Sequence, residues 1–390
     1  MNGRALRKGG LIPIVFLNKL ASLPDNIAWF NTRLPDLVTS YIIIAEQERV
    51  KEMGNIANVS VIIPTYSRVK DVDTCLDSIL SQRALPQEVI LVDDSKGSEI
   101  ENLARRREGD FESKTVKLEY IRNWKEASST IARNIGADSA NSDILLFLDS
   151  DVVLENDYVH EILNVYKEHS EAKAVQGMIR TDRYSLFSNI LGRLHILIFF
   201  QEVERCRVFP SLTVSYPEPT LNRVINCQWL SGANASFKKE ILKEFRWDEN
   251  LKKYAWGDDV DLPYRIHKKY PNELYMTPYA RLTHKSSTQG ESVVGRDIIY
   301  MEEVYYLYIF FKVIDQNIIN KLIYLESRIG RLLLRIIHTL RHSKSKTEPI
   351  KHLVGALVFC LKHKPEIRDG NLEFFNNTIK TVAVTASAPM

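Results

Sequence analysis

The feature that most constrains this chain is an alternation of strand and helix patterns over about ninety residues, from Val59 to Leu154. Short apolar runs predict buried strands, and the segments between them carry the spacing of apolar residues that is typical of helices. This alternation favours an α/β fold, with a mostly parallel sheet and helices on its faces. In such sheets ligands bind beyond the carboxyl ends of the strands. The four predicted strands lie in VSVIIPTY, EVILVDDS, VKLEYIR and ILLFLDSDVVL.

Two of these strands end in paired acids. Asp93 and Asp94 end the second strand, and Asp149 and Asp151 end the fourth. The first pair fits a turn or a helix cap. The second pair is costly, because two close carboxylates repel unless a cation or hydrogen bonds compensate them. A hard divalent ion such as Mg²⁺ or Mn²⁺, shared with phosphate oxygens, would supply that compensation.

Composition and missing motifs exclude several other classes of protein. The chain has 390 residues, 45% hydrophobic and 26% charged, which is the composition of a folded globular protein. A net charge of +3 is too small to favour nucleic-acid binding. The first strand is followed by no G-x-G-x-x-G motif, and the chain has no G-x-x-x-x-G-K-[ST] loop. Four cysteines without metal-ligand spacing favour a reducing compartment.

Five segments together resemble the family 2 glycosyltransferases, which are enzymes of the GT-A fold. In chain order they are VSVIIPTYSR, EVILVDDS, ARNIGADSANSDILLFLDSDVVL, LSGANASFKKEIL and WGDDVDLPYRI. The resemblance covers about residues 58 to 285. It implies transfer of a sugar, usually with inversion, from a nucleoside-diphosphate sugar that is UDP-, GDP- or dTDP-linked. It also implies assistance by Mg²⁺ or Mn²⁺.

The same resemblance implies roles for residues of the donor half. Asp149 and Asp151 would bind the metal and the diphosphate, and His284 would complete the metal shell, since neutral imidazole is a suitable ligand beside two carboxylates. Asp94 would read the nucleobase. Arg133 would lie near the donor, and the alternative is that it is an exposed helix cation. The alternative for His284 is a structural histidine. The full set expected to bind the donor is Pro64, Tyr66, Arg68, Asp94, Arg133 and Ser150.

The second half is expected to bind the acceptor. Asp258, Asp259 and Asp261 stand at the start of a predicted helix, where acids also interact favourably with the helix dipole. The family usually has Glu-Asp at the first two positions and uses the second acid as general base. We therefore expect Asp259 to be the base, with Asp258 as the second candidate. Gly232, Asn234 and Trp256 are expected to contact the acceptor, a glycan that could be lipid-linked.

A basic amphipathic helix is predicted from Ile318 to Leu340. Such a helix suits an anionic membrane interface, and the alternative is that its apolar face packs on the catalytic domain. No apolar stretch reaches the roughly 18 residues of a membrane span, so we expect a peripheral protein on the cytoplasmic face of a membrane. The predicted outward basic face comprises Lys321, Arg328, Arg331, Arg335, His338 and Arg341.

The expected organisation is an N-terminal helical extension at 1–57, a GT-A catalytic domain at 58–290 and a helical, membrane-associating region at 291–390. Within the catalytic domain, 58–155 would bind the nucleotide sugar and 156–290 the acceptor. One alternative is transfer to a lipid phosphate, which needs no general base. Others are a phosphatase whose first acid is the nucleophile, and a non-catalytic membrane adaptor that keeps the fold. The acids at 258–261 favour a hydroxyl acceptor.

Overall fold

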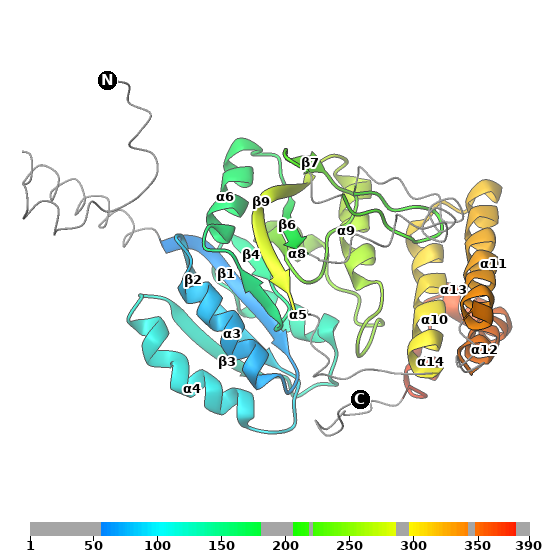
Figure 1. Ribbon diagram of the computed structural model, residues 1–390, viewed down its shortest axis with the longest axis horizontal. Coiled ribbons are helices and arrows are strands. Elements are labelled where there is room, and N and C mark those ends of the chain that lie inside the picture. The colour runs from blue at the N-terminus through cyan, green and yellow to red at the C-terminus, as the bar shows by residue number, and fades with distance from the viewer. Residues whose placement is uncertain (1–55, 181–205, 218–220, 286–295, 342–347, 380–390) are drawn as a thin grey trace, which may run out of the picture. The chain divides into compact units, whose positions relative to one another are not determined.

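The computed structural model describes residues 56–180, 206–217, 221–285, 296–341 and 348–379 (Figure 1). The chain divides into two compact units, Met1–Asn55 and Ile56–Met390. The first unit, and with it nearly all of the predicted extension at 1–57, lies outside the described residues. The predicted start of the catalytic domain at residue 58 falls inside the first strand, β1.

A mixed sheet of nine strands organises the described residues, in the order β3-β2-β1-β4-β8-β6-β9-β5 with β7 beside β9. The strands β3, β2, β1 and β4 are parallel neighbours, as the alternating pattern predicts. The second half is mixed, because β8 runs antiparallel to both β4 and β6. The strands are β1 Ile56–Thr65, β2 Leu85–Asp93, β3 Lys117–Arg122, β4 Ile144–Phe147, β5 Val152–Leu154, β6 Ala174–Arg180, β7 Ile225–Asn226, β8 Ala235–Lys238 and β9 Leu274–His284.

Helices cover both faces of the sheet because successive side chains of a strand point to opposite sides. In β1, Val61 and Ile63 pack in a buried cluster with α3, α4 and α6, whereas Ile62 belongs to a second cluster with α5 and α9. Both faces of the parallel half are therefore buried, as its nearly continuous apolar strands require. These helices, with the short α8, are α3 Val69–Leu80, α4 Glu99–Glu112, α5 Ser129–Ser139, α6 Tyr158–Glu168, α8 Lys239–Glu244 and α9 Asp258–Lys269.

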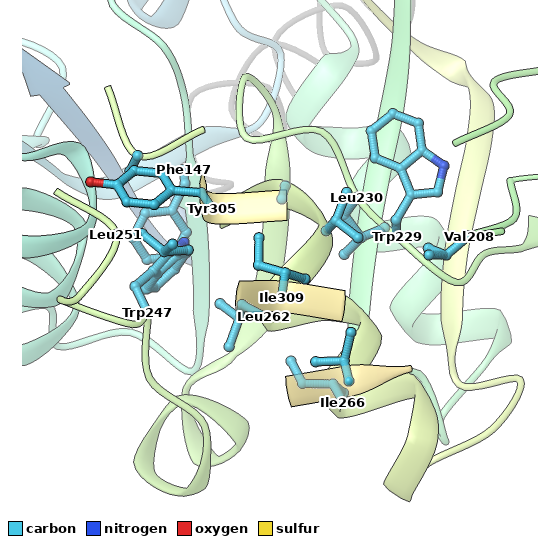
Figure 2. Close-up of a cluster of buried hydrophobic side chains, with 14 of the residues drawn as sticks. Phe147, Val208, Trp229, Leu230, Trp247, Leu251, Leu262, Ile266, Tyr305 and Ile309 are labelled. Atoms are coloured by element: carbon cyan, nitrogen blue, oxygen red, sulfur yellow. The ribbon is translucent and has the colours of Figure 1, made fainter. Parts of the chain in front are cut away.

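Helices also form the C-terminal part, and α10 joins them to the sheet domain. In Figure 2, Tyr305 and Ile309 of α10 lie in a buried cluster with Leu262 and Ile266 of α9. The core of the sheet domain thus continues into α10, and the predicted boundary at 290 stays a prediction. These helices are α10 Arg296–Val313, α11 Ile318–Arg341, α12 Glu348–Lys362, α13 Lys364–Arg368 and α14 Glu373–Asn376.

The predicted amphipathic helix is present as α11, but two cations of its expected outward basic face are turned inward. Arg328 and Arg331 were expected to face outward, and instead they form ion pairs with Glu302 and Glu303 of α10. The apolar residues do not pack on the catalytic domain as a whole, since Leu325 and many others on that face are more than half exposed. Among the described helices, none combines the length and the hydropathy that crossing a bilayer requires.

The last long strand, β9, also differs from its sequence pattern. The segment ELYMTP predicts a strand that ends near Pro278, whereas β9 continues to His284. Its register with β6 shifts between Gln176 and Met178. Pro278 lies within this irregular part of β9, where its lack of an N–H group costs no ladder hydrogen bond. Because the strand resumes after the shift, His284 reaches the edge of the sheet where Asp151 lies.

Candidate active site

The two acids of the fourth predicted strand lie at a corner between two strand pairings. After β4 the chain leaves β1, and the Asp149 amide donates to the Ala233 carbonyl at 3.2 Å. Three residues after Asp149, Val152 begins β5, which pairs antiparallel with the end of β9 so that Val152 lies opposite His284. The corner turns both carboxylates toward the end of β9. The backbone of both acids is held in place, because the Asp149 amide bonds to Ala233 and the Asp151 carbonyl accepts from the Lys285 amide at 2.9 Å.

Asp149, Asp151 and His284 form the one group of three or more metal-ligating side chains found within the described residues. One ligand atom from each lies within 4.8 Å of the others. His284 Nε2 lies 3.0 Å from Asp151 Oδ1 and 3.8 Å from Asp149 Oδ2. The hydrogen bond with Asp151 raises the pKa of His284. Two carboxylates and an imidazole are a donor set that Mn²⁺ or Mg²⁺ accepts, so these residues fit the predicted metal site.

Arg68 adds a cation to this corner. It stands at the end of the turn after β1, where Ser67 adopts a left-handed φ of 55°, an uncommon conformation for a residue other than glycine. Arg68 Nη1 donates to Asp151 Oδ2 at 2.7 Å. Pro64 lies near the carboxyl end of β1, and Tyr66 follows that strand. The structure therefore brings Arg68 to the metal-ligating group, while contacts of Pro64 and Tyr66 with the donor stay predictions.

The third predicted donor acid, Asp94, is held at the adjacent strand ends. Its carboxylate accepts hydrogen bonds from Asn123 Nδ2 at 2.6 Å and from the Ser128 amide at 3.0 Å. Asn123 follows β3, the strand beside β2, and sequence reasoning missed it. The available signal was its position, since a polar residue after a parallel strand lies on the same edge as the acids. Asp93, the other acid, is fully buried and bonds within the protein to Ser95 and Tyr120.

Arg133 connects the metal-ligating acids to the acids of α9. It projects from α5, is 6% exposed, and forms ion pairs with Asp258 and, at 3.3 Å, with Asp149. This excludes the alternative of an exposed helix cation. Its Nη2 also donates to the Gly232 carbonyl at 3.3 Å, and a Cβ at Gly232 would lie 3.0 Å from the same nitrogen. Any larger residue at 232 would crowd the guanidinium.

Asp258 and Asp259 open α9, as predicted, after Gly257, whose φ of 91° needs a glycine. Burial raises the pKa of Asp259, and the neighbouring Asp258 carboxylate raises it further. Burial also raises the pKa of Asp258, although Arg133 opposes that effect. The third acid, Asp261, is nearly fully buried and pairs with Arg265 and Lys312. The structure therefore separates one structural acid from two acids at a pocket.

The predicted acceptor residues occupy different environments. A small enclosed pocket is lined by residues that include Arg133, Gly232, Asp258 and Asp259. Trp256 is half-buried beside the exposed Tyr254, with ring centroids 5.8 Å apart. Asn234 is fully buried and donates to the Gly177 carbonyl at 2.9 Å. Ser150, assigned to the donor, is buried between the two acids. Contacts of all four predicted residues with a ligand stay predictions.

A sheet with a parallel first half and a mixed second half, with acids at its strand ends, agrees with the GT-A fold that the sequence resemblance implies. Comparison with known proteins agrees with this resemblance. The model of the family described as "Glycosyl transferase family 2" matches residues 60–246, and we identify this region as a domain of that family. The resemblance predicted from the sequence motifs is thereby confirmed.

Curated relatives and a solved structure are similar to the chain. A chondroitin synthase of Pasteurella multocida is 24% identical over 284 residues, which are 68% of this chain and 28% of that protein. A poly-beta-1,6-N-acetyl-D-glucosamine synthase of Staphylococcus epidermidis is 24% identical over 217 residues, 55% of this chain and 47% of the relative. The chain thus spans less than half the length of these two relatives.

One of the similar solved structures is that of TarS 1-349 of S. aureus in complex with UDP-GlcNAc. It has a TM-score of 0.50 and 17% sequence identity, and the match covers 80% of this chain and 82% of that one. At this identity the likeness supports the fold. The expected α/β architecture of the GT-A type, with a helical C-terminal part, is confirmed.

Proposed function

We propose that this protein is a metal-dependent glycosyltransferase that moves a sugar, with inversion, from a nucleoside-diphosphate sugar to a hydroxyl group of a glycan acceptor. The observation that carries the proposal is the cluster formed by Asp149, Asp151 and His284 beside Asp258 and Asp259, with Arg133 between the two groups. The family 2 domain and the UDP-GlcNAc named for the similar TarS structure support a nucleotide-sugar donor.

The acids at the sheet corner would hold the ion. Asp149 and Asp151 supply carboxylate oxygens and His284 supplies a ring nitrogen, and these donors suit Mg²⁺ or Mn²⁺. When bound, such an ion stabilises the negative charge that develops on the departing diphosphate. Burial and the charges of Asp151 and Asp149 raise the pKa of the nearby Cys75 thiol to about 12. Burial is the larger cause, and the smaller contribution of the two carboxylates means that they disfavour another negative charge nearby.

Arg68 and Asp94 would orient the nucleotide. Arg68 already hydrogen-bonds Asp151 at the corner, and a planar guanidinium is well suited to phosphate oxygens. Asp94 is fixed by Asn123 and by the Ser128 amide, so its carboxylate is positioned before a nucleobase binds. A positioned group loses less entropy on binding than a mobile one.

Asp259 would act as the general base toward the acceptor hydroxyl. Asp258 is ion-paired with Arg133, which engages its carboxylate, whereas the raised pKa of Asp259 makes it a stronger base than an ordinary aspartate. A base of this kind supports a hydroxyl acceptor. A lipid phosphate would arrive ionised and would have no proton to give.

The proposal also covers the kind of acceptor and the place in the cell where the protein acts. We expect a glycan that is free or lipid-linked, and a protein acting at the cytoplasmic face of a membrane. Support comes from the large apolar side chains that are exposed on α11 and α12.

The experiment is release of nucleoside diphosphate from a panel of UDP-, GDP- and dTDP-sugars, with Mn²⁺, with Mg²⁺ and with chelator. We expect one donor to be cleaved only with metal, and Asp151→Ala to abolish this reaction. Asp110→Ala is the matched control, because Asp110 is an exposed acid on α4 outside the site. Full activity in Asp151→Ala would refute the assignment. A protein that folds but cleaves no donor with any metal would instead match the non-catalytic adaptor.

A further inference from the structure

Exposed apolar side chains concentrate on two C-terminal helices. Of the fifteen large hydrophobic residues that are exposed among the described residues, eight lie on α11 and three on α12. Those on α11 recur every three or four residues, so most share one face of the helix. The α11 set is Ile318, Ile319, Leu322, Leu325, Ile329, Leu333, Ile337 and Leu340, and the α12 set is Val354, Val358 and Leu361. We call the α11 set the apolar stripe.

Buried ion pairs fix the stripe in its outward orientation. Arg328 is 5% exposed and lies 3.3 Å from Glu303 of α10, and it also donates to the Ser211 carbonyl at 3.1 Å. Arg331 pairs with both Glu302 and, at 2.8 Å, Glu303. Turning the stripe inward would break these pairs and leave charges buried without partners, which is strongly unfavourable. The exposure of the stripe is therefore a consequence of how α11 packs.

The charge around the stripe is strongly positive. Residues 318–364 contain ten lysines and arginines against two glutamates, whereas the whole chain has 52 against 49. Without Arg328 and Arg331, which α10 neutralises, eight lysines and arginines still stand against two glutamates. In the described part of this region, Lys321, Lys351 and Lys362 are exposed. A partner for this surface must accept apolar side chains and carry negative charge.

We propose that the apolar stripe of α11 and its basic surroundings dock on an anionic lipid bilayer. Apolar side chains would enter the boundary between headgroups and acyl chains, and the lysines would meet anionic headgroups. A second copy of the chain is disfavoured, because a symmetric contact places the same basic surface opposite itself, and like charges repel. The inference does not depend on the sugar-transfer proposal, because it uses no residue of the active site.

The test is co-sedimentation of the full chain with vesicles of phosphatidylcholine, with and without phosphatidylglycerol. We expect binding to the anionic vesicles at low salt and weaker binding at high salt, because salt screens the lysines. Ile329→Ser with Leu333→Ser should weaken binding at least about tenfold, since both side chains leave the bilayer interface. Lys321→Gln with Lys362→Gln should weaken it about 30-fold, at roughly fivefold per cation.

The control is Ile56→Ser, which changes a 40%-exposed isoleucine at the start of β1 and should leave vesicle binding unchanged. Unchanged thermal unfolding of the serine variants would show that they fold. Wild-type protein that stays in the supernatant with anionic vesicles at low salt would refute the proposal. So would light scattering that shows a dimer in lipid-free buffer and a monomer after Ile329→Ser with Leu333→Ser, because a second copy would then cover the stripe.

Discussion

Two clusters of charged side chains, one at the strand ends and one between α10 and α11, differ in their balance. Between the helices, Arg328 and Arg331 face Glu302 and Glu303, so two cations meet two acids. At the strand ends, four carboxylates gather around two arginines and a histidine. These are Asp149, Asp151, Asp258 and Asp259, with Arg68, Arg133 and His284.

The difference indicates which cluster does chemistry. A balanced buried cluster fixes how two helices pack, and it needs no ligand. A cluster with excess acid is costly unless a cation or a proton completes it. The strand-end cluster therefore calls for a bound ion and a carboxylate of raised pKa, which are the two components of the proposed reaction. A substitution at the strand ends should therefore change the reaction, whereas one between the helices should change stability.

The largest effect is expected at the proposed base. Asp259→Asn keeps the shape of the side chain but cannot accept a proton, so kcat should fall by about 10² to 10⁴. Donor affinity, measured by calorimetry, should stay close to that of the wild type. Asp258→Asn is the comparison, because it removes the partner of Arg133. If Asp258→Asn shows the loss of kcat with unchanged donor affinity and Asp259→Asn does not, the roles of the two acids are reversed.

A substitution in the balanced cluster should change stability and leave the chemical step intact. Arg331→Met leaves Glu302 and the buried Glu303 short of a cation, and we expect a loss of about 3 kcal/mol in unfolding free energy. Lys351→Met removes an exposed pair with Glu348 and should change the unfolding free energy far less. Urea unfolding measures both. Equal losses in the two variants would contradict a structural role for the buried cluster.

A smaller effect concerns the pH dependence of the reaction. The base acts when deprotonated, so activity should fall as the pH drops through its pKa. Burial and the Asp258 carboxylate raise the pKa of Asp259, so the acid limb of kcat/KM should lie above the usual aspartate range of about 4. In Asp258→Asn the limb should move to lower pH, because a neighbouring negative charge is gone. A limb that stays in place in this variant would argue against that coupling.

Much of the donor half could be predicted from the sequence because its signals are local. The apolar runs gave β1 to β4, and the acids of ILLFLDSDVVL lie where the strand ends. Asp259 at the start of α9 followed from the family motif and helix-start acids. Local patterns suffice where each strand and its acids are neighbours in the chain.

The features that were missed depend on distant partners. Pro278 suggested the end of a strand, but a register shift against β6 lets β9 continue to His284. The periodicity of α11 defines two faces without saying which one is buried, and that choice is made by Glu302 and Glu303, 25 or more residues earlier. Asn123 has no motif of its own, and its role is visible only beside Asp94.

The most direct test of the central claim is the metal dependence of nucleotide binding. Calorimetry with UDP, the nucleotide of the donor named for the similar TarS structure, should be run with Mn²⁺ and with chelator on the wild type and on Asp151→Ala. GDP and dTDP should follow if UDP does not bind. The account predicts that one nucleotide binds the wild type with Mn²⁺ and at least about tenfold more weakly without it, and that Asp151→Ala loses this difference. Nucleotide binding of equal strength with and without metal in the wild type would contradict it.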